Sequence, residues 1–168
     1  MPLFKDNAFV ADAWVRLADD AALPQSGDVI LPLARWRKER AGIAARAGST
    51  GVSIAAGENW DDLIPALSSV PLIALAFPKY TDGRAFSTGQ QLRVRHDYRG
   101  EIRAIGDVLL DEIALMIRCG FDAFEVTDER AIHGLQRGHV PKVSLFYQPA
   151  LGVEAPAGTR PWLRRRAG

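Results

Sequence analysis

The chain has 168 residues, 48% of them hydrophobic, and 21 lysines and arginines against 20 aspartates and glutamates leave a formal net charge of +1. This size fits one globular domain, and the near-neutral balance argues against attraction to nucleic acid or to an anionic membrane by the whole molecule. The only cysteine, Cys119, excludes an intrachain disulfide and a cysteine-based metal centre. With no leader or membrane-spanning pattern, the sequence predicts a cytoplasmic protein.

Residues 1–27 are predicted to form an N-terminal appendage with a short hairpin-like pattern. Candidate strands lie at residues 8–10 and 14–17, and the loop LPQSGD follows them. We therefore expect a single α/β domain over residues 28–149. The remaining residues, 150–168, are rich in Ala, Gly, Pro and Arg and are expected to form an extended basic C-terminal arm.

From residue 28 onward, short apolar runs alternate with segments of helical period. The apolar runs are residues 29–33, 51–54, 71–77, 101–106, 123–126 and 143–147. The helical segments are residues 34–46, 60–69, 84–95, 108–119 and 128–137. Because this alternation is typical of parallel strands with crossover helices, it predicts an α/β fold with five or six parallel strands. The count is too small for a closed eight-unit barrel, so we expect an open doubly wound sheet or an incomplete barrel.

The strongest helical pattern covers residues 108–119, where five apolar side chains fall on one face. Gly120 follows and is predicted to end this helix, because glycine readily adopts the left-handed conformation of a helix C-terminus.

The loops that follow the strands are the first places to look for a site, because ligands of parallel α/β sheets bind at the carboxyl ends of the strands. After the third run, Lys79 and Arg84 flank a turn that precedes a predicted helix. Free N–H groups and the helix dipole favour an anion there, so a phosphate, sulfate, sulfite or carboxylate would fit. Asp82 is the predicted cap of that helix, and a turn that is merely well capped is the alternative.

Charged residues interrupt the apolar run at residues 101–106. A period of two places Glu101, Arg103 and the following Asp107 on one face. Because charges inside a sheet must be paired, this strand either lies near an edge or holds Arg103 in a pocket with carboxylates around it. Arg103 is therefore a third candidate anion-binding residue, with Glu101 to orient it.

Asp107 and Glu125 stand at the ends of their strands and are the candidate residues for proton transfer beside Lys79, if the protein is an enzyme. The alternative is that Asp107, and Thr127 or Asp128, are helix caps. No metal site is predicted, because the three histidines are far apart in the sequence. No cofactor is evident, since a dinucleotide fingerprint and a haem motif are both missing, and a bound flavin is left open.

Four blocks together resemble a bacterial family, domain of unknown function 934, whose members are often labelled oxidoreductases of sulfite reduction. The blocks are DVILPLARW at 28–36, FPKYTDGRAFS at 77–87, GEIRAIGDVLLDE at 100–112 and RCGFDAFEV at 118–126. The resemblance implies a role in assimilatory sulfur metabolism, beside a sulfite or nitrite reductase hemoprotein.

Three functions are open at this point. The first is an accessory protein of sulfite assimilation that binds a small anion or docks on the reductase. The second is an enzyme that acts on a small anionic substrate by acid–base chemistry. The third is an interaction domain whose charged turns are caps only. A homodimer is also expected, because an incomplete barrel leaves apolar strand edges to be covered, whereas membrane and nucleic-acid partners are not expected.

Overall fold

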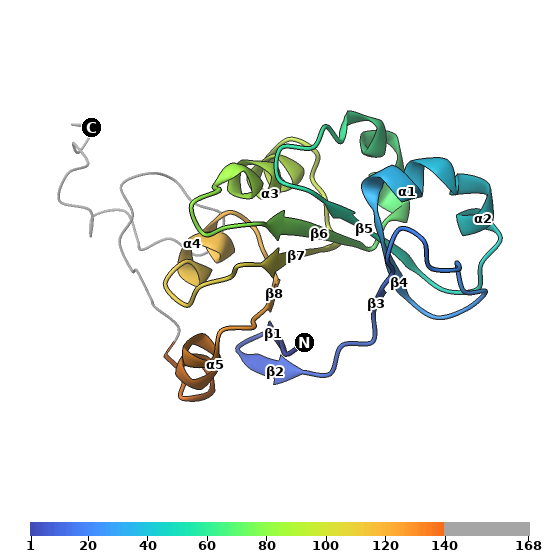
Figure 1. The fold of residues 1–168 in the computed structure, drawn as a ribbon. Helices are drawn as coiled ribbons and strands as arrows, with labels where there is room; N and C mark the ends of the chain where they lie inside the picture. Colours follow the sequence, from blue (N-terminus) through green and yellow to red (C-terminus); the bar gives the residue numbers. More distant parts are fainter. Residues whose placement is uncertain (140–168) are drawn as a thin grey trace, which may run out of the picture.

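The computed structural model describes residues 1–139 and shows an α/β fold around one eight-stranded sheet (Figure 1). The strands are β1 (Leu3–Lys5), β2 (Ala8–Val10), β3 (Val15–Arg16), β4 (Val29–Pro32), β5 (Thr50–Ile54), β6 (Leu72–Phe77), β7 (Glu101–Gly106) and β8 (Ala123–Glu125). Their order is β2-β1-β8-β7-β6-β5-β4-β3. Neighbouring strands from β3 to β8 are parallel, and β1 is antiparallel to both β2 and β8. The strand predicted at residues 143–147 and the predicted arm at 150–168 lie outside the described residues.

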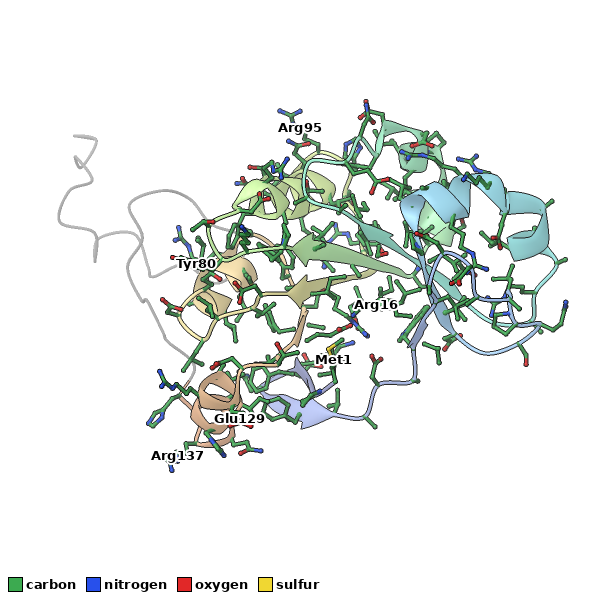
Figure 2. The ribbon with its side chains drawn as sticks, viewed as in Figure 1. Met1, Arg16, Tyr80, Arg95, Glu129 and Arg137 are labelled. Carbon is green, nitrogen blue, oxygen red and sulfur yellow. The ribbon has the colours of Figure 1, made fainter. Side chains whose placement is uncertain are left out.

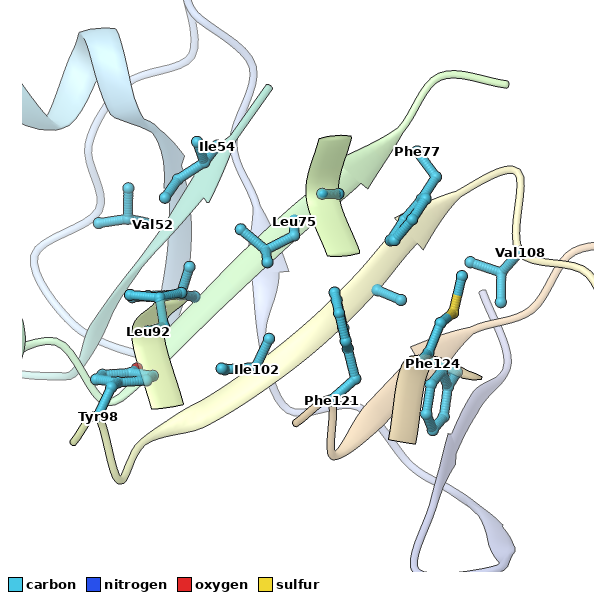
Figure 3. Close-up of a cluster of buried hydrophobic side chains, with 14 of the residues drawn as sticks. Val52, Ile54, Leu75, Phe77, Leu92, Tyr98, Ile102, Val108, Phe121 and Phe124 are labelled. Atoms are coloured by element: carbon cyan, nitrogen blue, oxygen red, sulfur yellow. The ribbon is translucent and has the colours of Figure 1, made fainter. Parts of the chain in front are cut away.

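The helices pack on one face of the sheet. They are α1 (Leu33–Lys38), α2 (Arg40–Ala44), the 3-10 helix η1 (Asp61–Ser69), α3 (Arg84–Val94), α4 (Ile113–Arg118) and α5 (Glu129–Gln136). Because strand side chains alternate between faces, Val52, Leu75 and Ile102 point to the helices and join the main core (Figure 3). The opposite face, called the inner face below, carries a smaller apolar group around Ile30 and Leu72.

The sheet is half of a barrel. Of the two predicted alternatives, the doubly wound sheet was wrong. A doubly wound sheet reverses its strand order at one point and has helices on both faces. Here β4 to β8 follow one another in chain order, and the buried apolar side chains of α1, η1, α3, α4 and α5 belong to a single core. The other alternative, an incomplete barrel, therefore describes the fold.

Residues 11–14, called the strap below, connect β2 at one edge of the sheet to β3 at the other (Figure 1). A fully extended chain advances at most about 3.6 Å per residue, so the strap bridges no more than about 18 Å. The outer strands of a flat eight-stranded sheet would lie about 34 Å apart. The sheet must therefore curl until its two edges approach each other, and the strap crosses the open side.

The N-terminal residues differ from their predicted arrangement. A strand at residues 8–10 is confirmed as β2, but the hairpin joins β2 to β1, and β3 lies at the far edge of the sheet. Residues 1–27, expected as an appendage, thus supply three strands to the sheet of the main domain. Polar Asp6 and Asn7, with φ angles of 51° and 62°, form the turn of this hairpin.

Several helices are shorter than their periodic patterns. The prediction of a helix at residues 108–119 was too long, because α4 begins only at Ile113 and turns precede it. Val108 lies before those turns and is 2% exposed, so the chain enters the core after β7 in a non-helical conformation. Gly120 has a φ of 95° and ends α4 as predicted. Within residues 1–139, every helix is too short or too polar to cross a lipid bilayer.

Candidate functional site

The predicted site residues fall into two separate groups. Lys79, Asp82, Arg84 and Asp107 lie at the turn between β6 and α3 and in the loop after β7. Glu101, Arg103 and Glu125 lie together on the inner face. The structure therefore brings Lys79 and Arg84 together but does not bring Arg103 to them. It also separates Glu125 from Asp107.

The turn after β6 is fixed by backbone and carboxylate contacts. The N–H of Asp82 donates to the carbonyl of Lys79 at 2.9 Å, which closes the turn. The N–H of Tyr80 donates to Oδ2 of Asp107 at 2.9 Å, which ties the turn to the loop after β7. Asp107 therefore positions this turn. It is not the cap of α4, because that helix starts six residues later in the chain, at Ile113.

Asp82 binds Arg84 with both carboxylate oxygens. The Nε and Nη2 atoms of Arg84 donate to Asp82 Oδ1 and Oδ2 at 2.9 and 2.6 Å, and the Arg84 backbone N–H lies 3.3 Å from Oδ1. The hydrogen bond from the guanidinium lowers the pKa of Asp82 to about 2. The N-cap residue of α3 is Gly83, so Asp82, the predicted cap, lies one residue before the observed N-cap position.

Lys79 is the cation of this turn that has no carboxylate partner among the described residues. It lines an open hollow of about 420 Å³ together with Pro78, Thr81, Asp82 and Arg84. The first turn of α3 begins beside this hollow, and the positive end of the helix dipole favours a negative charge there. An ammonium group, a hydroxyl group and a helix N-terminus are donors that a small oxyanion can use.

The inner face holds a cluster of six charged side chains, called the inner cluster below. Its members are Lys5, Asp12, Arg16, Glu101, Arg103 and Glu125. Arg103 is 1% exposed and lies 2.7 Å from Asp12, 2.9 Å from Glu101 and 3.6 Å from Glu125. Of the two predicted surroundings for Arg103, the pocket with carboxylates is therefore the one observed. Because carboxylates surround Arg103, the desolvation cost of burying its guanidinium is offset.

The two flanking cations complete the inner cluster. Lys5 of β1 donates to Glu101 at 2.7 Å, and Arg16 of β3 pairs with Glu125. Figure 2 shows Arg16 beside Met1 on the inner face, whereas Tyr80 lies toward the other end of the sheet. Burial alone would lower the pKa of Arg103, but the hydrogen bond to Asp12 and the charge of Glu101 outweigh it, and the pKa is raised. Arg103 therefore stays charged, with its charge balanced by neighbouring carboxylates.

Sequence reasoning missed Lys5, Asp12 and Arg16. A signal for Asp12 existed, because it is the only charged residue in the apolar stretch AFVADAWV at residues 8–15. A lone charge in an apolar stretch indicates a polar partner elsewhere in the fold. The partner lies 91 residues away on β7, however, and only the fold reveals it.

Among the predicted helix caps, Asp128 is confirmed. Its carboxylate accepts a hydrogen bond from the Ala131 N–H at 2.7 Å at the start of α5. Thr127 does not have this role. Within residues 1–139, no three side chains of His, Cys, Asp or Glu gather as a metal site would require.

Residues 51–158 match the model of a family described as "Bacterial protein of unknown function (DUF934)". The matched region covers well over half of the chain and contains Lys79, Arg84 and Arg103. Comparison with curated proteins gives no match, and comparison with solved structures gives none either. The chain therefore belongs to the DUF934 family of bacterial proteins of unknown function.

Proposed function

We propose that the chain is an accessory protein of assimilatory sulfite reduction that binds a small oxyanion at the turn between β6 and α3. The observation that carries the proposal is the position of Lys79 in an open hollow at the start of α3, without a carboxylate partner among the described residues. Sulfite is the oxyanion that the family resemblance suggests. Its three oxygens can accept hydrogen bonds from an ammonium, a hydroxyl and backbone N–H groups.

The charges that line the hollow beside Lys79 determine how strongly it should bind an oxyanion. The charge of Arg84 is balanced by Asp82, so Lys79 and the dipole of α3 supply the attraction. The hollow is open to water, which screens this attraction. Binding should therefore be weak, reversible and sensitive to ionic strength, as suits a protein that delivers an anion to a partner enzyme.

Thermal unfolding of the full chain at constant ionic strength tests the oxyanion site. Sulfite should raise the Tm of the wild type, because a ligand that binds only the folded state stabilises it. The Lys79→Met variant should lose the rise. Arg84→Met should lose it as well, because Asp82 would then face the anion without its partner. Lys38→Met is the matched control, since Lys38 is an exposed lysine on α1, and it should keep the full effect.

The proposal fails if sulfite, sulfate and phosphate leave the wild-type Tm unchanged, or if Lys79→Met responds as the wild type does. The role in sulfur metabolism has its own test in a bacterium that lacks the chain. Growth with sulfite as the sulfur source should be impaired and restored by cysteine. A wild-type copy should restore growth, whereas a Lys79→Met copy should not.

A second candidate function, docking on a sulfite or nitrite reductase hemoprotein, is favoured by apolar side chains near the same turn. Tyr80 is 59% exposed, and Leu115 and Ile117 on α4 are 43% and 44% exposed. The Tyr80–Asp107 hydrogen bond connects this turn to the loop that leads into α4. Co-purification of the reductase with the wild type, and its loss with Leu115→Ser and Ile117→Ser combined, would support docking.

A third candidate, acid–base chemistry on a small anion, is favoured by Asp107, which lies at the same turn as Lys79. Glu125 cannot act with it, because that carboxylate is 5% exposed and paired with cations of the inner cluster. An Asp107→Asn variant would separate the two roles of this residue. It should keep the hydrogen bond to Tyr80 through the amide oxygen and lose proton transfer.

A further inference from the structure

The strap depends on one side chain for its polar contact with the inner face. Within the described part of the chain, no backbone group of residues 11–13 is hydrogen-bonded to the sheet. Asp12 makes the contact instead, with Oδ2 at 2.7 Å from Nη1 of Arg103. Its other oxygen accepts the N–H of Trp14 at 3.1 Å, which shapes the strap itself. Asp12 thus reaches the buried guanidinium from a segment that crosses the open side of the half-barrel.

Asp12 also decides the charge of the inner cluster. Lys5, Arg16 and Arg103 are three cations that face the three carboxylates of Asp12, Glu101 and Glu125, so the cluster is neutral. Glu101 and Glu125 are fixed on strands in the middle of the sheet. Without the Asp12 carboxylate, three cations would face two carboxylates, and a single negative charge would restore neutrality.

A cavity lies next to Asp12. It has a volume of about 190 Å³ and is lined by Met1, Asp12, Trp14, Arg16, Ile30 and Glu125. This volume is large enough for a small carboxylate or for hydrogen sulfite, but too small for a typical drug-sized molecule. Because Asp12 lies between this cavity and Arg103, removal of its side chain would open the cavity toward the guanidinium.

From these contacts we infer that Arg103 is the centre of a second binding site for a small monoanion, and that Asp12 occupies this site as a built-in carboxylate. The contact between Asp12 and Arg103 therefore blocks the binding of an external anion at this site. An anion reaches Arg103 only when the strap carries Asp12 away. Guanidinium groups bind carboxylates and oxyanions through the same N–H donors, which is why one can replace the other. This site is independent of Lys79 and goes beyond the proposed function.

Chemical rescue of an Asp12→Ala variant of the full chain tests the inference. The variant should have a lower Tm than the wild type, because Arg103 loses a carboxylate partner. Formate, exchanged for chloride at constant ionic strength, should restore most of this loss. The wild type, whose site is filled, should show no comparable response. The measurement is made in the Lys79→Met background, so that an anion bound at the turn cannot contribute.

Two further variants separate a specific site from a general salt effect. Asp62→Ala removes one of the two carboxylates that pair with the partly exposed Arg37, at 2.7 Å, without uncovering a buried guanidinium, and formate should not rescue it. Arg103→Met removes the cation that three carboxylates share and would lower the stability strongly, so the conservative Arg103→Lys is used here. In the double variant Asp12→Ala/Arg103→Lys, residue 103 keeps its positive charge but lacks the planar N–H donors of a guanidinium. Formate should therefore restore less of the Tm than it does in Asp12→Ala alone. Equal rescue of Asp12→Ala and Asp62→Ala, or no rescue of either, would overturn the inference.

Discussion

Arg84 and Arg103 each bind the carboxylate of the residue two positions earlier, but their surroundings differ. The Arg103 side chain is 1% exposed and has three carboxylate partners, whereas that of Arg84 is 63% exposed and has Asp82 alone. Breaking a buried pair leaves an uncompensated charge, whereas water and salt screen an exposed one. The same local pattern therefore holds the fold together on the inner face and leaves the turn after β6 free to bind a ligand.

The largest effect expected from this comparison is that of Arg103→Met. Removal of the buried cation leaves Asp12, Glu101 and Glu125 without it, and losing one partner of a buried pair costs about 3–5 kcal/mol. Arg84→Met should change the free energy of unfolding far less. Urea unfolding of both variants measures the difference, and equal losses of stability would remove the distinction between the two regions.

Gly106→Ala tests the connection between β7, which carries Arg103, and the loop that holds Asp107, because Gly106 ends β7 and precedes Asp107. Its φ is 98°, and a Cβ there would collide with the carbonyl oxygen of Phe77. Backbone strain of this kind costs about 1–3 kcal/mol. Gly27→Ala is the matched control, since Gly27 has a φ of 85° but open space around it. Thermal unfolding should show the larger loss for Gly106→Ala, and the clash account fails if the two losses are equal.

A smaller difference in the free energy of unfolding is expected between variants of two aspartates that precede helices. Asp128 caps α5 through the Ala131 N–H, so Asp128→Ala should cost about 1 kcal/mol. Asp82 is not the N-cap residue of α3 and lies in an exposed pair, so Asp82→Ala should cost less. Urea unfolding measures both values. A greater loss for Asp82→Ala would show that the turn is needed for stability.

The smallest expected effect is a change in the pKa of one side chain, Asp82. The pKa of Asp82 is lowered from 3.8 to about 2 by the hydrogen bond from Arg84. A lowered carboxyl pKa stabilises the folded state above the unfolded value, and this contribution is lost as the pH falls from about 4 toward 2. In Arg84→Met, the pKa of Asp82 should return toward its ordinary value. NMR titration of the carboxyl carbon measures it, and an unchanged pKa would show that another group causes the shift.

Much of the fold could be predicted from local patterns. The apolar runs became β4 to β8, because parallel strands under a layer of helices need apolar side chains. The charges at Glu101 and Arg103 predicted either an edge strand or a pocket of carboxylates around Arg103, and the pocket is observed. The choice between a doubly wound sheet and an incomplete barrel could not be made, because the order of strands depends on long-range packing that no local pattern contains.

The candidate sites were harder to predict than the strands. The expectation that ligands bind in the loops after the strands placed Lys79 and Arg84 together, since both belong to one turn. It did not separate Arg103 from them, because a residue in the middle of a strand can face either side of the sheet. Asp12 and Arg16 reach the inner cluster only because the strap links opposite edges of the curled sheet. The periodicity of residues 108–119 overstated α4, since burial of Val108 overrides helical preference there.

The most direct test of the central claim follows both regions in one experiment. Two-dimensional NMR of backbone amides, recorded while sulfite is added at constant ionic strength, reports on the turn and on β7 at once. We predict that the amide signals of residues 79–85 shift and that those of residues 101–105 do not, because Asp12 already occupies Arg103. Shifts confined to β7, or no shift at either place, would contradict the assignment of oxyanion binding to the turn.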